Sequence, residues 1–113
     1  KVCAAAGLRA ELPLWQQPHR DLVDELLALG YCARVVCVDA RFLDASFCGR
    51  EFDADFLADL PDGVDACGEN GEFHTFVFDG PRFARPVSHE LVAVREIRQS
   101  APALGHHFVA ELR

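Results

Sequence analysis

One short stretch of the sequence, residues 67–81, brings together several side-chain types that take part in chemistry. It reads CGENGEFHTFVFDGP, and seven consecutive positions of it hold two carboxylates, a carboxamide, an imidazole and a hydroxyl: Glu69, Glu72, Asn70, His74 and Thr75. Gly68 and Gly71 bracket the first of these side chains and permit backbone conformations in which amide groups approach a ligand closely. Burial of so many polar groups is costly unless they have partners. The stretch therefore predicts a polar ligand site at the entrance of a strand.

Two interpretations of this stretch are open from the residues alone. Side chains alternate along a strand, so Glu72 and His74 are expected on one face and Phe73 and Thr75 on the other. A glycine-flanked pair of acids is also typical of a solvated turn, in which His74 is a partly buried side chain with no ligand. A metal centre needs a third ligand beside Glu72 and His74, and the cysteine spacings fit no zinc template, so no metal site is expected.

Three further places in the sequence have chemical potential. Asp39 and Arg41 follow the apolar run VVCV, which predicts that they stand at the end of a buried strand, where α/β sites commonly lie. A surface ion pair is the alternative interpretation. Cys67 is either a nucleophile or a small residue that helps to form the turn, and the second is favoured because no base is assured beside it. Trp15 indicates packing between domains rather than stacking on a nucleotide.

The spacing of apolar residues predicts the elements that position these side chains. Helices are expected at residues 19–29, between Pro18 and Gly30, and at residues 52–60, which end at a Pro-Asp-Gly turn. Strands are expected at 8–12, 32–38, 72–78, 87–97 and 106–112, and residues 1–6 have the character of a helix tail. Alternation within 87–97 changes face near Leu91, which is typical of a β-bulge. The pattern predicts an α+β fold, with a mixed sheet, two or three helices and C-terminal antiparallel strands.

Composition excludes several classes of protein. The 113 residues fit one domain, and 18 acidic against 11 basic side chains give a net charge of −7, which argues against a nucleic-acid partner. No apolar run approaches the ~20 residues that cross a bilayer, so no membrane partner is expected. Five cysteines without a C-x-x-C pair favour a reducing compartment, and we expect the cytoplasm. Because the sequence contains no Met and begins with Lys1, we expect a piece of a longer polypeptide.

The run CGENGEFHT resembles the C-terminal signature of the diphthine–ammonia ligase family, in the version of its bacterial branch. That family is part of the PP-loop ATP pyrophosphatase, or adenine nucleotide alpha hydrolase, superfamily. Other pieces that resemble the family occur in the same order along the chain: PLW from Pro13, VVCVDAR from Val35, LDASFCGREFD from Leu43 and FLADL from Phe56. The resemblance covers nearly the whole sequence.

The resemblance implies that this chain is part of a two-domain enzyme. Members have an N-terminal Rossmann-like domain whose Ser-Gly-Gly-Lys-Asp-Ser loop holds the ATP phosphates, and this sequence contains no such loop. Residues 1–15 are then the tail of that nucleotide-binding domain, and residues 16–113 the C-terminal, substrate-side domain. The family activates a carboxylate by AMP transfer, with release of pyrophosphate, and ammonia then forms the amide. ATP and Mg²⁺ would act through the absent domain, a small carboxylate or a protein would be the acceptor, and a homodimer is a further expectation.

Roles follow from the resemblance residue by residue. Catalytic roles are implied for Glu69, Glu72 and His74. Substrate-binding roles are implied for Gly68, Asn70, Gly71 and Thr75, and they are expected for Asp39 and Arg41 because of their place at the end of a buried strand. His74 stands where the archaeal and eukaryotic branch has Glu, which leaves the acceptor open. The alternative to a ligase is a non-catalytic module that binds a nucleotide or metabolite.

Overall fold

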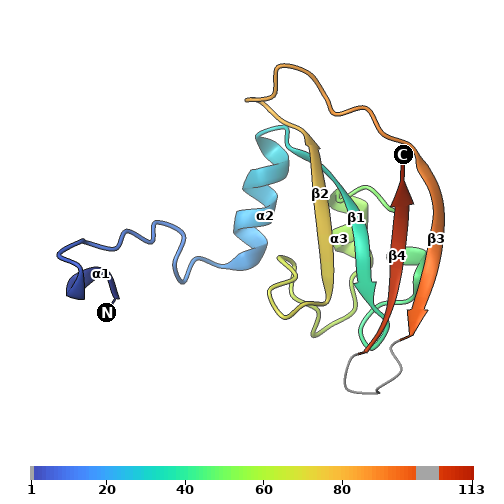
Figure 1. Cartoon of the computed structure of the whole chain (residues 1–113), viewed down its shortest axis with the longest axis horizontal. Coiled ribbons are helices and arrows are strands. Elements are labelled where there is room, and N and C mark those ends of the chain that lie inside the picture. Colours follow the sequence, from blue (N-terminus) through green and yellow to red (C-terminus); the bar gives the residue numbers. More distant parts are fainter. Residues whose placement is uncertain (1, 99–104) are drawn as a thin grey trace.

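The computed structural model describes residues 2–98 and 105–113. Lys1, at the start of the expected helix tail, lies outside this range. In chain order the elements are α1 (Val2–Ala5), α2 (His19–Ala28), β1 (Cys32–Asp39), η1 (Ala45–Phe47), α3 (Ala54–Asp59), β2 (Phe73–Asp79), β3 (Leu91–Arg98) and β4 (His106–Leu112) (Figure 1).

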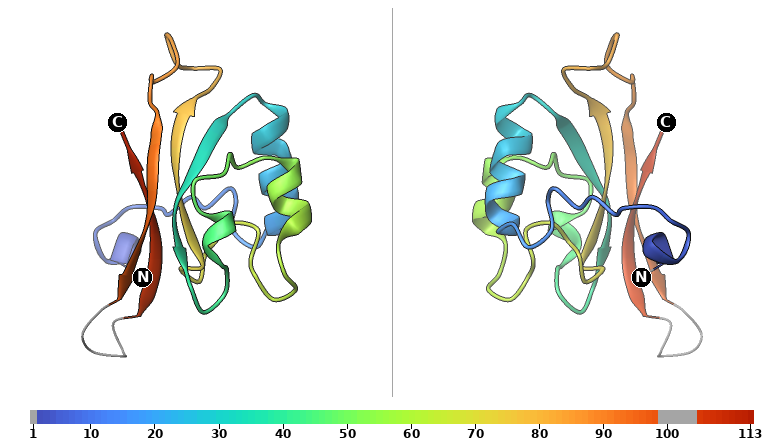
Figure 2. Two further views of the ribbon diagram at one scale, coloured as in Figure 1. Left: turned by 90° about the vertical axis from the view of Figure 1, so that its right-hand side faces the viewer. Right: turned by 90° about the vertical axis from the view of Figure 1, so that its left-hand side faces the viewer.

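The four strands form one sheet in the order β2-β1-β4-β3. The α+β class with C-terminal antiparallel strands is confirmed, and within it every pairing is antiparallel, so the sheet is not mixed. Helices α2 and α3 lie on one face of the sheet, and neither of them covers the opposite face (Figure 2). The domain therefore has two layers, with the core between the helices and the sheet.

Local chemistry explains where the helices begin and end. Asp53 caps α3, because its carboxylate accepts a hydrogen bond from the Phe56 amide at 2.9 Å. Helix α2 starts after Pro18, whose ring fixes a suitable φ, and ends before Gly30, which has a φ of +93°. The longest helix of the described part is α2, with 10 residues, and no helix there has the length and apolarity to cross a membrane.

The core is built around a cluster of phenylalanines. Phe56 of α3 is fully buried, and its ring centroid lies 5.3 Å from that of Phe73 and 5.5 Å from that of Phe52. Val35 and Val38 of β1 are equally buried below the helices. The hydrophobic patterns of residues 32–38 and 52–60 thus correspond to two of the elements that form this core, β1 and α3.

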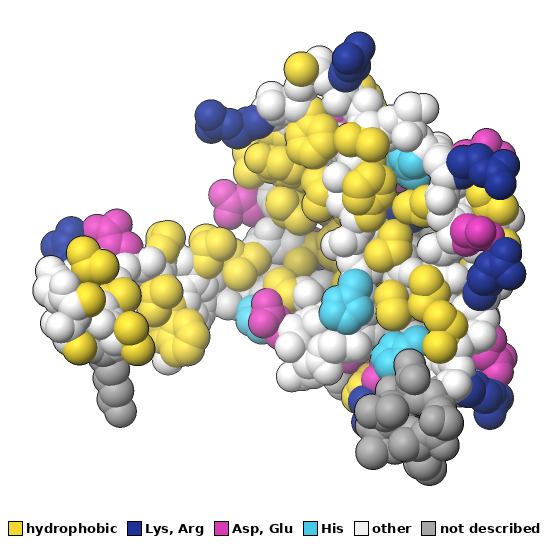
Figure 3. Space-filling view, in the orientation of Figure 1, with side chains coloured by type: hydrophobic (Ala, Val, Ile, Leu, Met, Phe, Trp, Pro, Cys, Tyr) yellow, Lys and Arg dark blue, Asp and Glu magenta, His cyan; other side chains and the backbone are white. Residues whose placement is uncertain are grey.

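The open face of the sheet is partly apolar. Figure 3 shows hydrophobic side chains gathered there, with histidines among them. His89 packs on the rings of Phe76 and Phe78 and accepts a hydrogen bond from Arg34 at 2.9 Å. The segment after β2 therefore folds back to cover one end of this face.

Two strand predictions need correction. The segment 8–12 contains no strand and is exposed, because no other strand lies beside it to accept its backbone hydrogen bonds. The strand expected at residues 87–97 begins only at Leu91, and its register with β4 shifts between Leu91 and Ala93. The change of alternation near Leu91 thus marks the irregular start of β3.

Replacing Phe56 by Ala tests the core. The variant leaves a cavity among three aromatic rings, so we expect the free energy of unfolding to fall by about 3–5 kcal/mol, measured by urea denaturation. Phe42→Ala is the matched control, because Phe42 is 39% exposed and its loss is expected to cost about 1 kcal/mol or less. Equal losses in the two variants would contradict this account of the core.

Candidate functional site

Residues 65–72, called here the signature loop, connect the end of the helical layer to β2. Gly68 and Gly71 have φ values of +65° and +78°, a region that residues with a Cβ rarely adopt. A Cβ added to Gly68 would also lie 2.9 Å from the carbonyl oxygen of Phe73. The tight backbone expected of these glycines is therefore present, and at Gly68 it is enforced by a close approach to β2.

Glu72 is the most deeply buried charged side chain of the described residues, with 1% of its surface exposed. One carboxylate oxygen, Oε2, accepts hydrogen bonds from the Asp65 amide at 2.8 Å and from Asn70 Nδ2 at 3.4 Å. The other, Oε1, accepts from the Asn70 amide at 2.8 Å. Burial alone would raise the pKa of Glu72, but these hydrogen bonds outweigh it and hold the pKa below the ordinary value.

Asp65 links the signature loop to the first residue of α2. Its Oδ1 lies 2.7 Å from Nδ1 of His19, and its Oδ2 accepts a hydrogen bond from the Glu69 amide at 3.0 Å. The hydrogen bond with Asp65 raises the pKa of His19, and the negative charges of Asp65 and Glu69 add to this effect. Burial opposes ionisation of Asp65, yet the hydrogen bonds from His19 and from backbone amides leave its pKa lowered.

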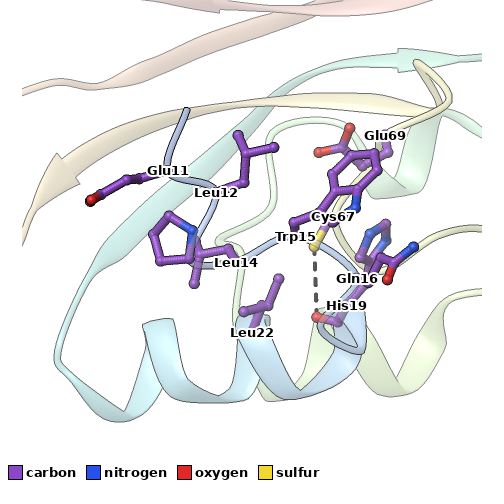
Figure 4. Close-up of a pocket in the computed structure, with 10 residues that line it drawn as sticks. Glu11, Leu12, Leu14, Trp15, Gln16, His19, Leu22, Cys67 and Glu69 are labelled. Carbon is purple, nitrogen blue, oxygen red and sulfur yellow. Dashed lines mark hydrogen bonds between the residues drawn. The ribbon is translucent and has the colours of Figure 1, made fainter. Parts of the chain in front are cut away.

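A cleft of about 600 Å³ opens beside this pair. Its apolar walls come from the segment before α2 and from α2 itself: Leu12, Pro13, Leu14, Trp15 and Leu22. Its polar groups are Glu11, Gln16, His19, Cys67 and Glu69. Figure 4 shows the side chains of Trp15, Glu69 and His19 toward one end of the cleft and Glu11 at the other.

A second hollow of about 440 Å³ adjoins the first and shares four of its residues, Leu14, Leu22, Cys67 and Glu69. Glu69 therefore borders both spaces. In the described part of the chain its carboxylate accepts no hydrogen bond, so its oxygens are available to a ligand.

Cys67 lies in the same wall and donates a weak hydrogen bond from Sγ to the carbonyl oxygen of His19 at 3.6 Å (Figure 4). Burial raises the pKa of the Cys67 thiol, and the nearby charges of Asp65 and Glu69 raise it further. A reactive cysteine needs the opposite environment, which favours the thiolate. The interpretation of Cys67 as a small residue of the turn is therefore supported over that of a nucleophile.

Asp39 and Arg41 lie at the end of β1, as the sequence predicts. Asp39 is buried, and its Oδ2 lies 2.7 Å from Nη2 of the exposed Arg41. This hydrogen bond holds the pKa of Asp39 below its ordinary value, although burial opposes it. The Asp39 amide donates to the carbonyl oxygen of Glu72 at 2.9 Å, so the pair stands directly beside the signature loop.

The remaining predicted residues lie outside the cleft lining. His74 is exposed in β2, opposite Cys37 of β1, and Thr75, also exposed, is the Cα partner of the buried Val35. Within the described residues no hydrogen bond or ion pair joins Glu72 to His74, so the two do not form a facing pair. Of the predicted residues, the structure places Glu69 in the cleft and the others around the loop or along the sheet.

Sequence reasoning missed His19 and Asp65. Their contact joins residues 46 positions apart, and no local pattern marks it. The one available signal is the position of His19 directly after Pro18, where a helix begins. Among the described residues no group of three His, Cys, Asp or Glu side chains is arranged to hold a metal ion.

The ion pair between His19 and Asp65 predicts a measurable titration. Asp65→Asn removes the carboxylate that stabilises the imidazolium, so we expect the pKa of His19 to fall toward its ordinary value of 6.5. The measurement is an NMR titration of the His19 ring, with Asp62→Asn, an exposed neighbour in sequence, as the control that leaves it in place. A His19 pKa that is the same in wild type and Asp65→Asn would show that the pair does not form in solution.

Comparison with known proteins identifies relatives of this chain. The family described as diphthamide synthase C-terminal domain matches residues 18–101. Diphthine–ammonia ligases of Homo sapiens and Bos taurus are each 33% identical over 91 residues, which cover 76% of this chain and 34% of the relative. The Schizosaccharomyces pombe protein of the same name is 28% identical over 95 residues, 76% of this chain and 15% of its own length. The chain thus spans about a third of the mammalian relatives, and it belongs to the diphthamide synthase C-terminal domain family.

Proposed function

We propose that this chain is the C-terminal part of an ATP-dependent, AMP-forming amide ligase and forms the acceptor side of its active-site cleft. Family membership supports the reaction class, since the matched relatives are named diphthine–ammonia ligases. The observation that carries the proposal is the exposed Glu69, whose backbone is held by the signature loop and whose side chain lines a cleft of about 600 Å³. The acceptor is a carboxylate-bearing small molecule or protein, and ammonia is the nucleophile.

Glu69 has the central role in this proposal. A carboxylate that accepts no hydrogen bond within the described residues can bind ammonium and take up a proton as ammonia attacks the activated acceptor. The apolar side chains of Leu14, Trp15 and Leu22 line the same cleft. His19 contacts Asp65 through Nδ1, so its other ring nitrogen, Nε2, is a second polar group for the acceptor.

The other predicted residues keep proposed roles at the end of the sheet. Asp39 and Arg41 adjoin the signature loop, and His74 lies one strand away, opposite Cys37. Their polar side chains suit an acceptor that extends from the cleft onto the sheet. Gly68, Asn70, Gly71 and Thr75 belong to this proposal as residues of the loop and of β2 that shape the acceptor site.

ATP and Mg²⁺ belong, in this proposal, to a part of the protein outside the chain. The net charge of −7 and the three carboxylates of the signature loop repel phosphates, and the described residues include no metal-binding group of three. We accordingly place the boundary between a nucleotide-binding domain and this domain at residues 15 and 16. The family match begins at residue 18, and Leu8, Leu12, Leu14 and Trp15 are exposed, as expected of a segment that packs against another domain.

Two properties of the whole protein complete the proposal. The five cysteines, all within the described residues, are free, which fits a reducing cytoplasm. The exposed apolar side chains of β3, among them Leu91 and Ile97, fit association into a homodimer.

Glu69→Gln tests the proposed reaction. In the full-length gene product, supplied with ATP, ammonium chloride and a peptide that bears diphthine, we expect release of AMP and pyrophosphate to fall about 10²-fold. Glu51→Gln is the matched control, because Glu51 is exposed and lies outside the cleft, and its turnover should equal that of wild type. Unchanged turnover in Glu69→Gln would remove Glu69 from the mechanism.

Calorimetry separates the ligase from a binding module without catalysis. Residues 1–113 are titrated with ATP and with AMP. A ligase domain that relies on a nucleotide site elsewhere should bind neither tightly. Tight binding by this chain alone, together with no acceptor-dependent AMP release by the full-length protein, would favour the module and overturn the proposal.

A further inference from the structure

The environment of the Glu72 carboxylate is unusual for a buried charge. Its side chain is 1% exposed, and in the described part of the chain no Lys, Arg or His lies within ion-pair distance of it. Its hydrogen-bond donors are instead the backbone amides of Asp65 and Asn70 and the Asn70 carboxamide. Such a ring of N–H groups stabilises an anion without a cation.

Both carboxylate oxygens of Glu72 are occupied by hydrogen bonds from within the chain. Oε2 binds the start of the signature loop at Asp65, and Oε1 binds its far side at Asn70. The carbonyl oxygen of Glu72 in turn accepts from the Asp39 amide at the end of β1. The Glu72 side chain therefore joins both arms of the loop, its backbone carbonyl ties them to the sheet, and the carboxylate presents no surface to a ligand.

The two residues that Glu72 binds are also those that place Glu69. Asn70 follows Glu69 directly, and Asp65 accepts the Glu69 amide hydrogen through Oδ2 at 3.0 Å. The backbone on either side of Glu69 is thus held, while its carboxylate borders the cleft. Loss of the Glu72 charge would free Asp65 and Asn70 together and release Glu69 from the cleft wall.

We infer that Glu72 is a positioning residue that acts through Glu69, and that it does not touch the acceptor. This departs from the direct catalytic role that the family resemblance implies for Glu72. The inference about the loop concerns the chain itself, and its consequence for turnover rests on the proposed function.

Amide hydrogen exchange of residues 1–113 tests the structural half. Gln in place of Glu72 has one acceptor oxygen, and its NH₂ group faces a backbone donor, so the amides of Asp65 and Asn70 should exchange about 10- to 100-fold faster. Glu69→Gln is the matched variant, with the same isosteric change three residues away, and should leave both rates unchanged. The amide of the buried Val35 in β1, which donates to the Arg50 carbonyl oxygen, reports on global stability in each protein. Equal exchange of Asp65 and Asn70 in wild type and Glu72→Gln would overturn the inference.

An acid titration of the wild type gives the same information if Glu72→Gln does not fold. The Asp65 and Asn70 amide resonances should shift together with the Glu72 carboxyl carbon, at a pH below 4.5. Asp39, Asp65 and Glu69 are the other carboxyl groups near Glu72 or its hydrogen-bond donors, and their own carboxyl carbons are followed separately. Amide shifts that follow Asp65 or Asp39 instead of Glu72 would contradict the inference.

A double-mutant cycle in the full-length protein tests the functional half. If Glu72 acts through Glu69, release of AMP and pyrophosphate by Glu69→Gln/Glu72→Gln should match that of Glu69→Gln alone. A side chain that contacts the reactants independently, or that merely lowers the folded fraction, would multiply the two losses, and this outcome rejects the inference. A wild type that releases no AMP would refute the proposed function, while the exchange experiment still decides the role of Glu72 in the loop.

Discussion

A buried negative charge held only by N–H groups organises the region between the helical layer and β2. The Glu72 carboxylate accepts hydrogen bonds from the amides of Asp65 and Asn70, and the backbone carbonyl oxygen of Glu72 accepts one from the Asp39 amide at the end of β1. Each contact depends on the loop following one particular course, which Gly68 and Gly71 permit through positive φ. Because an uncompensated buried carboxylate is very costly, the loop cannot leave this course without exposing or neutralising Glu72. The charge thus acts as a constraint on conformation.

Two carboxyl groups of the signature loop, and the histidine beside it, have shifted pKa values that set the pH range in which the loop is stable. Glu72 and Asp65 have lowered pKa values, so their contribution to stability is present above the ordinary values of 4.5 and 3.8 and is lost as the pH falls through the folded-state values. His19 has a raised pKa, so its contribution is complete below 6.5 and is lost as the pH rises through the folded-state value. The loop and its contact with α2 are therefore held best between pH 4.5 and 6.5.

The periodic spacing of apolar residues predicts much of the fold, because the buried face of a helix or strand is marked by residues that are close in sequence. The helix 19–29, the strand 32–38 and the strand 106–112 correspond to α2, β1 and β4. The segment 8–12 has a strand-like pattern, but no strand of the sheet pairs with it. Alternation within one segment does not show whether the fold supplies a partner strand. The site shows the same limit. Alternation puts Glu72 and His74 on one face, whereas the loop amides determine where the Glu72 carboxylate points, and His19 meets Asp65 only through tertiary structure.

The arrangement separates two demands that a single carboxylate does not meet well. A group that holds a loop needs all its hydrogen bonds satisfied by the protein, as those of Glu72 are, whereas a group that binds a ligand needs unused acceptor sites. Glu69 meets the second demand because Asp65 and Asn70 fix its backbone while its carboxylate borders the cleft beside Trp15. Preorganisation of the backbone lowers the cost of ordering the loop when a ligand arrives. Two acids three residues apart, one buried and one at the cleft, are therefore better explained as a support and the group it supports than as a pair that acts on one substrate.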